Sequence, residues 1–234
     1  SFDIAERIQT PVFVLSDLDM GMNQWMSKPF QYPDTPMDRG KVLWEGDLEY
    51  LKGDWGRYRD VDGDGIPYRT LPGNRHPQAA YFTRGTGHDE NARYSEDHEV
   101  WNKLLDRLKR KFDTARQYVP KPVVENGGDA AFAIISTGST HPAIEEARHQ
   151  MSKKGLNSDF LRVRAVPFTQ EVQDFIHSHD RLYVVEMNRD GQLYQLLLLE
   201  YPQFAHKLIK IAYTDGLPMT ARRVRESILA HEEK

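Results

Sequence analysis

The second half of the chain repeats one order of elements, a short apolar run followed by an amphipathic helical pattern. The predicted strands are residues 132–136, 161–166, 182–186 and 208–212, and the predicted helices are about 140–153, 169–178, 191–201 and 220–232. Short links join them. Alternation of this kind is typical of a parallel sheet covered by helices on both faces, so we expect a doubly wound α/β domain. Within it, residues 196–199 read as a helix buried on most sides.

A long helix and an irregular connector precede this domain. Apolar residues at helical spacing run from Trp101 to Val119, and Pro120 stops the helix. Residues 28–95, by contrast, carry many Pro and Gly residues and little periodicity. They predict an irregular connector with room for a short hairpin. Loops this long in a compact chain are usually functional or belong to an interface.

The beginning of the chain predicts a helix that leads into a strand. Ile4, Ala5 and Ile8 have helical spacing, and residues 12–15 are an apolar run typical of a buried parallel strand. A protein rarely opens in the second half of a helix that feeds a buried strand, so we expect a C-terminal piece of a longer protein. The predicted division has three parts, residues 1–27, the connector with its helix at 28–124, and the α/β domain at 125–234.

Composition excludes several classes of function. The chain is 39% hydrophobic and 28% charged with a formal net charge of −4, which supports a folded core and offers no basic patch for nucleic acid. No apolar run approaches the roughly 18 residues of a membrane span. The absence of Cys removes disulfides, thiolate nucleophiles and cysteine-held iron–sulfur clusters from the chain. It fits a reducing cytoplasm, where we expect the protein.

The loop at residues 81–94, YFTRGTGHDENARY, is the candidate functional segment. It has too little apolar content for a core strand or an amphipathic helix. An Arg fork suits a carboxylate or phosphate, a His titrates near neutrality, and Gly lets backbone approach a ligand closely. The charged candidates in this loop are Arg84, His88, Asp89 and Glu90. The alternative is a solvated loop at a subunit contact.

Other polar motifs have an ordinary structural explanation beside a functional one. Asp60, Asp62 and Asp64 begin like a calcium loop, but Leu71 stands where a bidentate Glu is needed, so a turn whose side chains cap local backbone is the alternative. Residues 136–140, STGST, join a strand to a helix and could hold an anion or simply cap the helix. Residues 186–192 at the next strand end could contact a ligand or a partner. The nine His residues form no HExxH-type pair, so no zinc site is expected.

Four segments resemble the α subunit of 2-oxoacid:ferredoxin oxidoreductases, and within that family the 2-oxoglutarate synthase branch. These are residues 10–23 (TPVFVLSDLDMGMN), 60–73, 81–94 and 184–190 (VVEMNRD). They occur in order along essentially the whole chain. The resemblance implies oxidative decarboxylation of a 2-oxoacid, with 2-oxoglutarate favoured, on thiamine diphosphate. Two electrons pass through iron–sulfur clusters to ferredoxin, and an acyl-CoA is formed.

The same resemblance implies how the work is divided among domains and subunits. Residues 1–27 resemble the end of a pyrimidine-binding domain, and residues 125–234 a transketolase-C-terminal-like domain. A β subunit is expected to supply the pyrophosphate domain, the Mg²⁺ site and a cluster, which agrees with the absence of Cys here. The family's YP-x-TP segment and activating Glu are expected upstream. Alone, therefore, the chain is expected to hold no thiamine diphosphate and to catalyse nothing, and self-association is expected.

The resemblance also implies that the Arg84–Glu90 loop borders the substrate pocket of the full complex. Arg84 would attract substrate carboxylates, and His88 or Asp89 would set substrate choice or move protons. No residue of the chain is assigned a catalytic role. Two alternatives stay open: a non-catalytic α/β module that scaffolds a partner subunit, and a related thiamine enzyme such as a transketolase-like protein. The loop favours the oxidoreductase over the latter.

Overall fold

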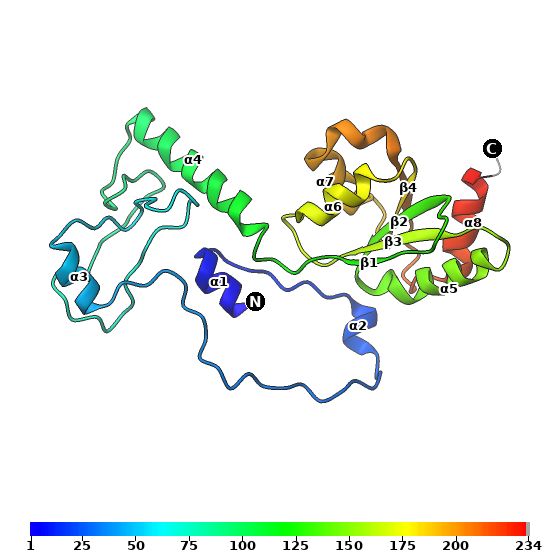
Figure 1. Cartoon of the computed structure of the whole chain (residues 1–234), viewed down its shortest axis with the longest axis horizontal. Helices are drawn as coiled ribbons and strands as arrows, with labels where there is room; N and C mark the ends of the chain where they lie inside the picture. The colour runs from blue at the N-terminus through cyan, green and yellow to red at the C-terminus, as the bar shows by residue number, and fades with distance from the viewer. Residues whose placement is uncertain (233–234) are drawn as a thin grey trace. The chain divides into compact units, whose positions relative to one another are not determined.

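The computed structural model describes residues 1–232, which form two compact units. The N-terminal unit comprises residues 1–14 and 28–118, and the C-terminal unit comprises residues 15–27 and those from 119 onward (Figure 1). The three-part division into evolutionary domains stays a prediction. Within residues 1–232, no helix combines the length and apolarity that a membrane span requires.

The C-terminal unit is built on a five-stranded sheet of order β1-β3-β2-β4-β5. Its strands are β1 (Val123–Glu125), β2 (Phe132–Thr137), β3 (Ser158–Val163), β4 (Leu182–Glu186) and β5 (Leu208–Ala212). Strands β2 to β5 are parallel, which confirms the predicted α/β fold. The edge strand β1 pairs antiparallel with β3, and sequence analysis missed it because three residues are too few to show a period.

Helices cover both faces of this sheet, as Figure 1 shows. They are α5 (His141–Ser152), α6 (Gln170–His177), α7 (Gln192–Glu200) and α8 (Ala221–Glu232), with short 3-10 helices η1 (Gly138–Thr140) and η2 (Pro202–Lys207). Successive strand residues point to opposite faces. Ile134 therefore packs with α5 and α8, and Ile135 with α6 and α7. The four predicted helices are confirmed, but the predicted burial of residues 196–199 is wrong in part, because Leu197 is buried and Leu199 is 80% exposed.

The predicted strand at residues 12–15 is wrong. Helix α1 (Phe2–Ile8) forms as expected, but the segment after it is extended, unpaired and exposed, with Phe13 84% and Leu15 90% accessible. An apolar run becomes a strand only where a neighbouring strand accepts and donates its backbone hydrogen bonds, and no described residue does so here. The short helix α2 (Leu18–Met22) follows, capped by Asp17, whose Oδ1 accepts a 2.9 Å hydrogen bond from the Met20 amide.

The N-terminal unit contains α3 (Glu45–Leu51) and α4 (His98–Ala115) besides α1. Its apolar core is small: Leu43, Leu48 and Ala79 are buried, with Leu51, Trp55 and Tyr68 packed against them. The predicted long helix is confirmed as α4, but most of its apolar stripe is not buried. The residues more than a third exposed are Trp101, Leu105, Leu108 and Phe112. The connector is thus more ordered than predicted, since it includes α3 and this core.

Candidate functional site

The loop at residues 81–94 folds around a tight turn at Asp89. An isolated bridge joins His88 to Tyr94, and the Asp89 amide donates to the Arg93 carbonyl at 2.9 Å. The Asp89 Oδ1 accepts from the Asn91 and Arg93 amides, each at 2.9 Å. A carboxylate that caps two backbone amides holds the turn in shape. The role that the geometry supports for Asp89 is therefore to position the loop.

Arg84 lines a cavity of about 610 Å³ beside this loop. Its guanidinium lies 5.1 Å from the centre of the Tyr94 ring. A Cβ at Gly85 would lie 2.8 Å from the same ring, and φ there is +72°, so this position requires Gly. Glycine at position 85 therefore lets the backbone pass close to the Tyr94 ring, which is the ring that Arg84 contacts. The use of Arg84 as an anion-binding group stays a prediction.

His88 lies against a different cavity, of about 190 Å³. Its ring stacks on Tyr58, with ring centres 3.9 Å apart, and its Nδ1 lies 3.2 Å from the Asp89 carbonyl oxygen. Glu90 lines neither cavity. Its carboxylate is 3.6 Å from Arg59 Nε and mostly exposed. The four predicted residues are near one another in sequence but do not converge on one cavity.

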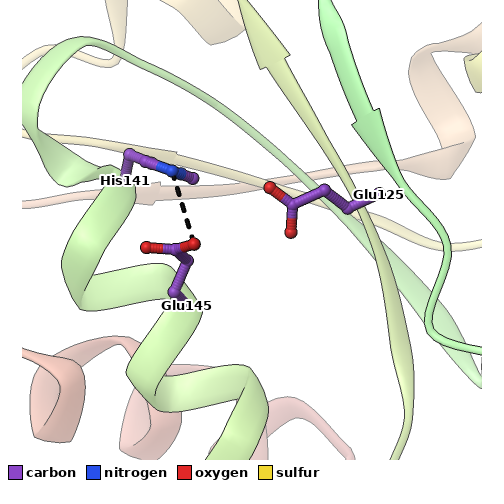
Figure 2. A group of neighbouring side chains, drawn as sticks. All are labelled: Glu125, His141 and Glu145. Atoms are coloured by element: carbon purple, nitrogen blue, oxygen red, sulfur yellow. Dashed lines mark ion pairs between the residues drawn. The ribbon is translucent and has the colours of Figure 1, made fainter.

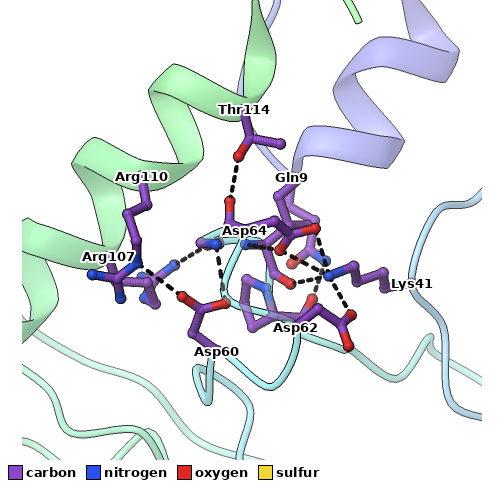
Figure 3. A network of polar contacts seen from close by, with 11 residues as sticks. Gln9, Lys41, Asp60, Asp62, Asp64, Arg107, Arg110 and Thr114 are labelled. Carbon is purple, nitrogen blue, oxygen red and sulfur yellow. Dashed lines mark hydrogen bonds and ion pairs between the residues drawn. The ribbon is translucent and has the colours of Figure 1, made fainter. Parts of the chain in front are cut away.

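The acidic loop at residues 60–65 surrounds a Lys side chain. Lys41 Nζ lies 2.6 Å from Asp62 Oδ2, 2.8 Å from Asp64 and 2.9 Å from the Ile66 carbonyl (Figure 3). Although burial lowers it, hydrogen bonds to the two carboxylates raise the pKa of Lys41 above its ordinary value. The chain's own ammonium occupies the position that a metal cation would take. The structural alternative to a calcium loop is therefore the better interpretation.

The third acid of this loop, Asp60, serves as a support for helix α4. Its Oδ1 accepts from the Gly65 amide at 3.0 Å, and its Oδ2 accepts from Arg110 Nε at 3.1 Å. The loop is fixed to α4 a second time by Thr114, whose hydroxyl donates to the Asp64 carbonyl at 2.8 Å (Figure 3). The Asp60 side chain and the Asp64 carbonyl therefore bind the loop to α4.

The cavity beside His88 is lined by three cationic side chains that sequence analysis did not select. They are Arg57, Arg107 and Lys111. Arg107 is only 7% exposed. A signal was present in the sequence: Leu104, Arg107, Leu108 and Lys111 follow the i, i+3, i+4, i+7 spacing of one helix face. Two cations on an otherwise apolar face, rather than on the solvated one, indicate a polar pocket.

The strand-to-helix turn at residues 136–140 does hold an anion, and the anion belongs to the chain. The Ser139 amide and hydroxyl both donate to Asp17 Oδ2, the amide at 3.3 Å. The hydroxyl bond is the main reason that the pKa of Asp17 lies below its ordinary value. The turn is thus an anion site, as its residue types allowed, and it is occupied by a side chain of the same unit.

The polar residues after β4 are likewise used within the fold. Glu186 is 1% exposed, and its carboxylate accepts from the Leu193 amide at 2.8 Å and the Tyr194 amide at 3.0 Å. Asn188 Oδ1 accepts from the Gly191 amide at 2.7 Å. These bonds satisfy the otherwise unpaired amides at the start of α7. Capping, rather than ligand contact, explains this segment.

One His/Glu group in the C-terminal unit has the residue types of a metal site. Glu125, His141 and Glu145 place their ligand atoms within 4.8 Å of one another, and His141 Nε2 lies 3.5 Å from Glu145 Oε1 (Figure 2). Arg148 Nη1, however, already lies 2.5 Å from Glu125 Oε2. A guanidinium beside the carboxylate disfavours a divalent cation. This group is better described as an ion-pair network.

Comparisons with known proteins were made for the whole chain, and no protein-family model matches it. The chain is 30% identical, over 97% of its length, to the protein named 2-oxoacid:ferredoxin oxidoreductase 2, subunit alpha, of Aeropyrum pernix. It is 27% identical, over 80% of its length, to 2-oxoglutarate synthase subunit KorA of Archaeoglobus fulgidus.

A solved structure has the same fold. It is the 2-oxoglutarate:ferredoxin oxidoreductase from Magnetococcus marinus with 2-oxoglutarate, coenzyme A and succinyl-CoA bound, which matches 97% of this chain with a TM-score of 0.78 at 23% identity. The chain spans 35% of the A. pernix protein, 45% of KorA and 38% of the solved chain. Over nearly its whole length, the chain is therefore similar to part of the α subunit of 2-oxoacid:ferredoxin oxidoreductases, which confirms the resemblance predicted from its motifs.

Proposed function

We propose that the chain is a segment of the α subunit of a 2-oxoacid:ferredoxin oxidoreductase. The complex oxidatively decarboxylates a 2-oxoacid, transfers the acyl group to CoA and passes two electrons to ferredoxin. The observation that carries this proposal is the 30% identity, over 97% of the chain, to such an α subunit. Similarity to KorA favours 2-oxoglutarate as the 2-oxoacid.

The described residues of this chain do not fit the iron–sulfur cluster or the Mg²⁺ of the proposed complex. With no Cys, the chain has no thiolates for an iron–sulfur cluster. The acids of residues 62–64 are neutralised by Lys41, and Glu125 by Arg148, which leaves neither group suited to Mg²⁺. We therefore assign thiamine diphosphate, Mg²⁺ and the cluster to other domains or to the β subunit. CoA and ferredoxin are the proposed co-substrate and electron acceptor, self-association is proposed, and the cytoplasm is the proposed compartment.

The role proposed for this chain is to border the substrate pocket with the loop at residues 81–94. Arg84 would attract the carboxylates of the 2-oxoacid, because a guanidinium fork matches a carboxylate. His88 would hold or move a proton, since its imidazole lines a cavity and can both donate and accept a hydrogen bond. Asp89 would act through the turn that its carboxylate caps, and Glu90 would lie at the loop surface.

A non-catalytic scaffold is the second candidate, and one observation favours it. Between residues 13 and 25 the side chains of Phe13, Leu15, Leu18, Met22 and Trp25 are each more than 70% exposed. Exposed apolar side chains in such density mark an interaction surface. The same surface would also serve an α subunit that binds other subunits. Only an activity measurement separates the two functions.

The test is to isolate the native complex through this chain and assay dye reduction. We expect reduction of methyl viologen that requires both 2-oxoglutarate and CoA. Within that complex, Arg84→Gln should raise the KM for 2-oxoglutarate about tenfold, because one charge-assisted bond is lost, and Asp89→Ala should change the 2-oxoacid preference or rate.

Two results would count against the proposal. A complex inactive with every 2-oxoacid tried would leave the scaffold as the function. An active complex in which neither loop variant alters KM, preference or rate would retain the enzyme but remove the loop from its substrate pocket. A Lys109→Gln variant, with the same loss of charge at an exposed position of α4, is the matched control.

A further inference from the structure

The cavity beside His88 gathers positive charge without any acid in its lining. Its volume is about 190 Å³, and Arg57, Arg107 and Lys111 line it together with Thr86 and Tyr58. None of the lining residues is Asp or Glu. Because like charges repel more strongly where water is partly excluded, such a grouping costs free energy unless something compensates it.

Arg57, Arg107 and His88 all contact the Tyr58 ring. The guanidinium carbon of Arg57 lies 4.7 Å from the ring centre, and that of Arg107 lies 5.5 Å from it. His88 stacks on the same ring at 3.9 Å. Cation–π contact offsets part of the repulsion. It supplies no hydrogen-bond acceptor for the N–H groups of Arg57.

The hydrogen-bond partners in the cavity are neutral or absent among the described residues. Arg107 Nη1 donates to the Gly65 carbonyl at 3.1 Å, and Lys111 Nζ donates to the Gln9 carbonyl at 3.0 Å. Arg57 Nε and Nη1 are buried and have no acceptor in the described part of the chain. Buried donors are normally satisfied, so these two indicate that an acceptor is missing.

The pKa of Lys111 is lowered by burial and by the neighbouring positive charges. Burial, and then the charges of Arg107 and Arg57, lower the pKa of Lys111 to about 8. The same causes, burial first and then Arg57, lower the pKa of Arg107. The charge of the nearby acid Asp60 opposes the lowering at Arg107 only in part, and its two oxygens already accept from Gly65 and Arg110.

Elsewhere the chain supplies its own counter-ions. Lys41 lies between two carboxylates, Arg148 pairs with Glu125, and Asp17 fills the turn at Ser139. The cavity at Tyr58 differs from these three sites in that no carboxylate among the described residues lines it. A ligand from outside the described chain is the simplest source of the missing negative charge.

We propose that this cavity is a binding site for a small oxyanion, a carboxylate or phosphate group, held by Arg57, Arg107 and Lys111. A cavity of this volume holds about six water molecules, which suits one such group and a short remainder of a larger molecule. Arg57 supplies the unsatisfied donors, and Thr86 a hydroxyl. This cavity is not the one that Arg84 lines, although Arg57 lines both and Thr86 and His88 belong to the loop proposed above. The test of the site needs no enzymatic activity.

The experiment is calorimetric titration of the chain with inorganic phosphate and, separately, with succinate. Ionic strength is matched with NaCl, because screening alone would otherwise change the signal. We expect saturable binding of at least one probe at pH 7, weakened about tenfold or more in Arg57→Gln and in Lys111→Gln, since each removes a charge-assisted bond. Preference for phosphate or for succinate distinguishes the two sources of the oxyanion.

The matched control is Lys109→Gln, which removes one charge from an exposed position of α4 between Arg107 and Lys111. It should bind as the wild type does, and Arg57→Lys should retain part of the affinity. Circular dichroism of each variant verifies folding, and Lys111→Gln carries the test if Arg57→Gln does not fold. Absence of saturable binding for both probes, or equal weakening by Lys109→Gln, would overturn the proposal.

Discussion

The C-terminal unit buries apolar clusters on both faces of its sheet, whereas the N-terminal unit has one small apolar cluster and a network of ion pairs. In the former, Ile134, Ile135 and Leu161 are fully buried beneath helices. In the latter, Leu48 belongs to a three-residue apolar core, and Arg107 is a buried charged residue. Ion pairs and hydrogen bonds, such as those of Lys41 and Asp60, hold the loops to α4 and to each other.

The contrast shows two ways of making a defined structure. Apolar burial is non-directional and tolerates changes at the surface, so we expect it to supply most of the stability of the C-terminal unit. A polar network is directional, so each of its groups fixes a particular geometry but contributes little net free energy. We therefore expect the N-terminal unit, with its smaller apolar core, to be the less stable of the two.

The largest effect on stability is expected from a cavity in the core of the C-terminal unit. Leu161→Ala removes a fully buried side chain from β3 and should lower the free energy of unfolding by about 2–5 kcal/mol. Leu199→Ala, at an exposed position of α7, should change it by less than about 0.5 kcal/mol. Urea denaturation of both variants provides the measurement. Similar effects for the two would show that the unit does not depend on its core as described.

Two glycines test how closely the acidic loop of the N-terminal unit packs on α4. Gly63 and Gly65 have nearly equal φ, +75° and +77°, but a Cβ at Gly65 would lie 2.3 Å from the Lys111 amide of α4, and one at Gly63 meets nothing within 4 Å. Both alanine variants carry the left-handed strain, so their difference isolates the close approach to the helix. We expect Gly65→Ala to be less stable than Gly63→Ala by about 2 kcal/mol. Equal denaturation midpoints would mean that the loop moves freely on α4.

The smallest expected effect is a pH dependence from Lys111. Its pKa is about 8 in the folded chain and has its ordinary, higher value when unfolded, so between pH 8 and about 10.5 the unfolded state binds more protons. The unfavourable charge is fully present below pH 8. The free energy of unfolding attributable to Lys111 should therefore rise with pH across this window.

The variant Lys111→Met serves as the reference, because other Lys and Tyr residues also titrate in that range. At neutral pH it should raise the melting temperature by a few degrees, about 2–4 °C, by relieving repulsion with Arg107 and Arg57. The difference in melting temperature between Lys111→Met and the wild type should shrink as pH approaches 10. An advantage that is constant from pH 7 to 10 would contradict the assigned pKa shift.

Sequence periodicity predicted the C-terminal unit well and the candidate site only in part. The strands and helices from residue 132 onward follow from alternation and helical spacing, which are local properties. Residues 12–15 have the same local character as those strands, yet they are exposed, because pairing depends on a neighbour. The loop at residues 81–94 was recognised from its residue types, whereas Arg57, Arg107 and Lys111 were not, because they come from segments about fifty residues apart.

The amino-acid sequence by itself determined the parallel α/β unit, the long helix α4 and the resemblance to oxidoreductase α subunits, since these rest on patterns read along the chain. Only the tertiary structure decided which charges are neutralised and which are not. Lys41 fills the acidic loop, Asp17 fills the turn at Ser139, and the cavity at Tyr58 has no such partner among the described residues. Electrostatic balance depends on distances across the fold, and a linear pattern does not contain those distances.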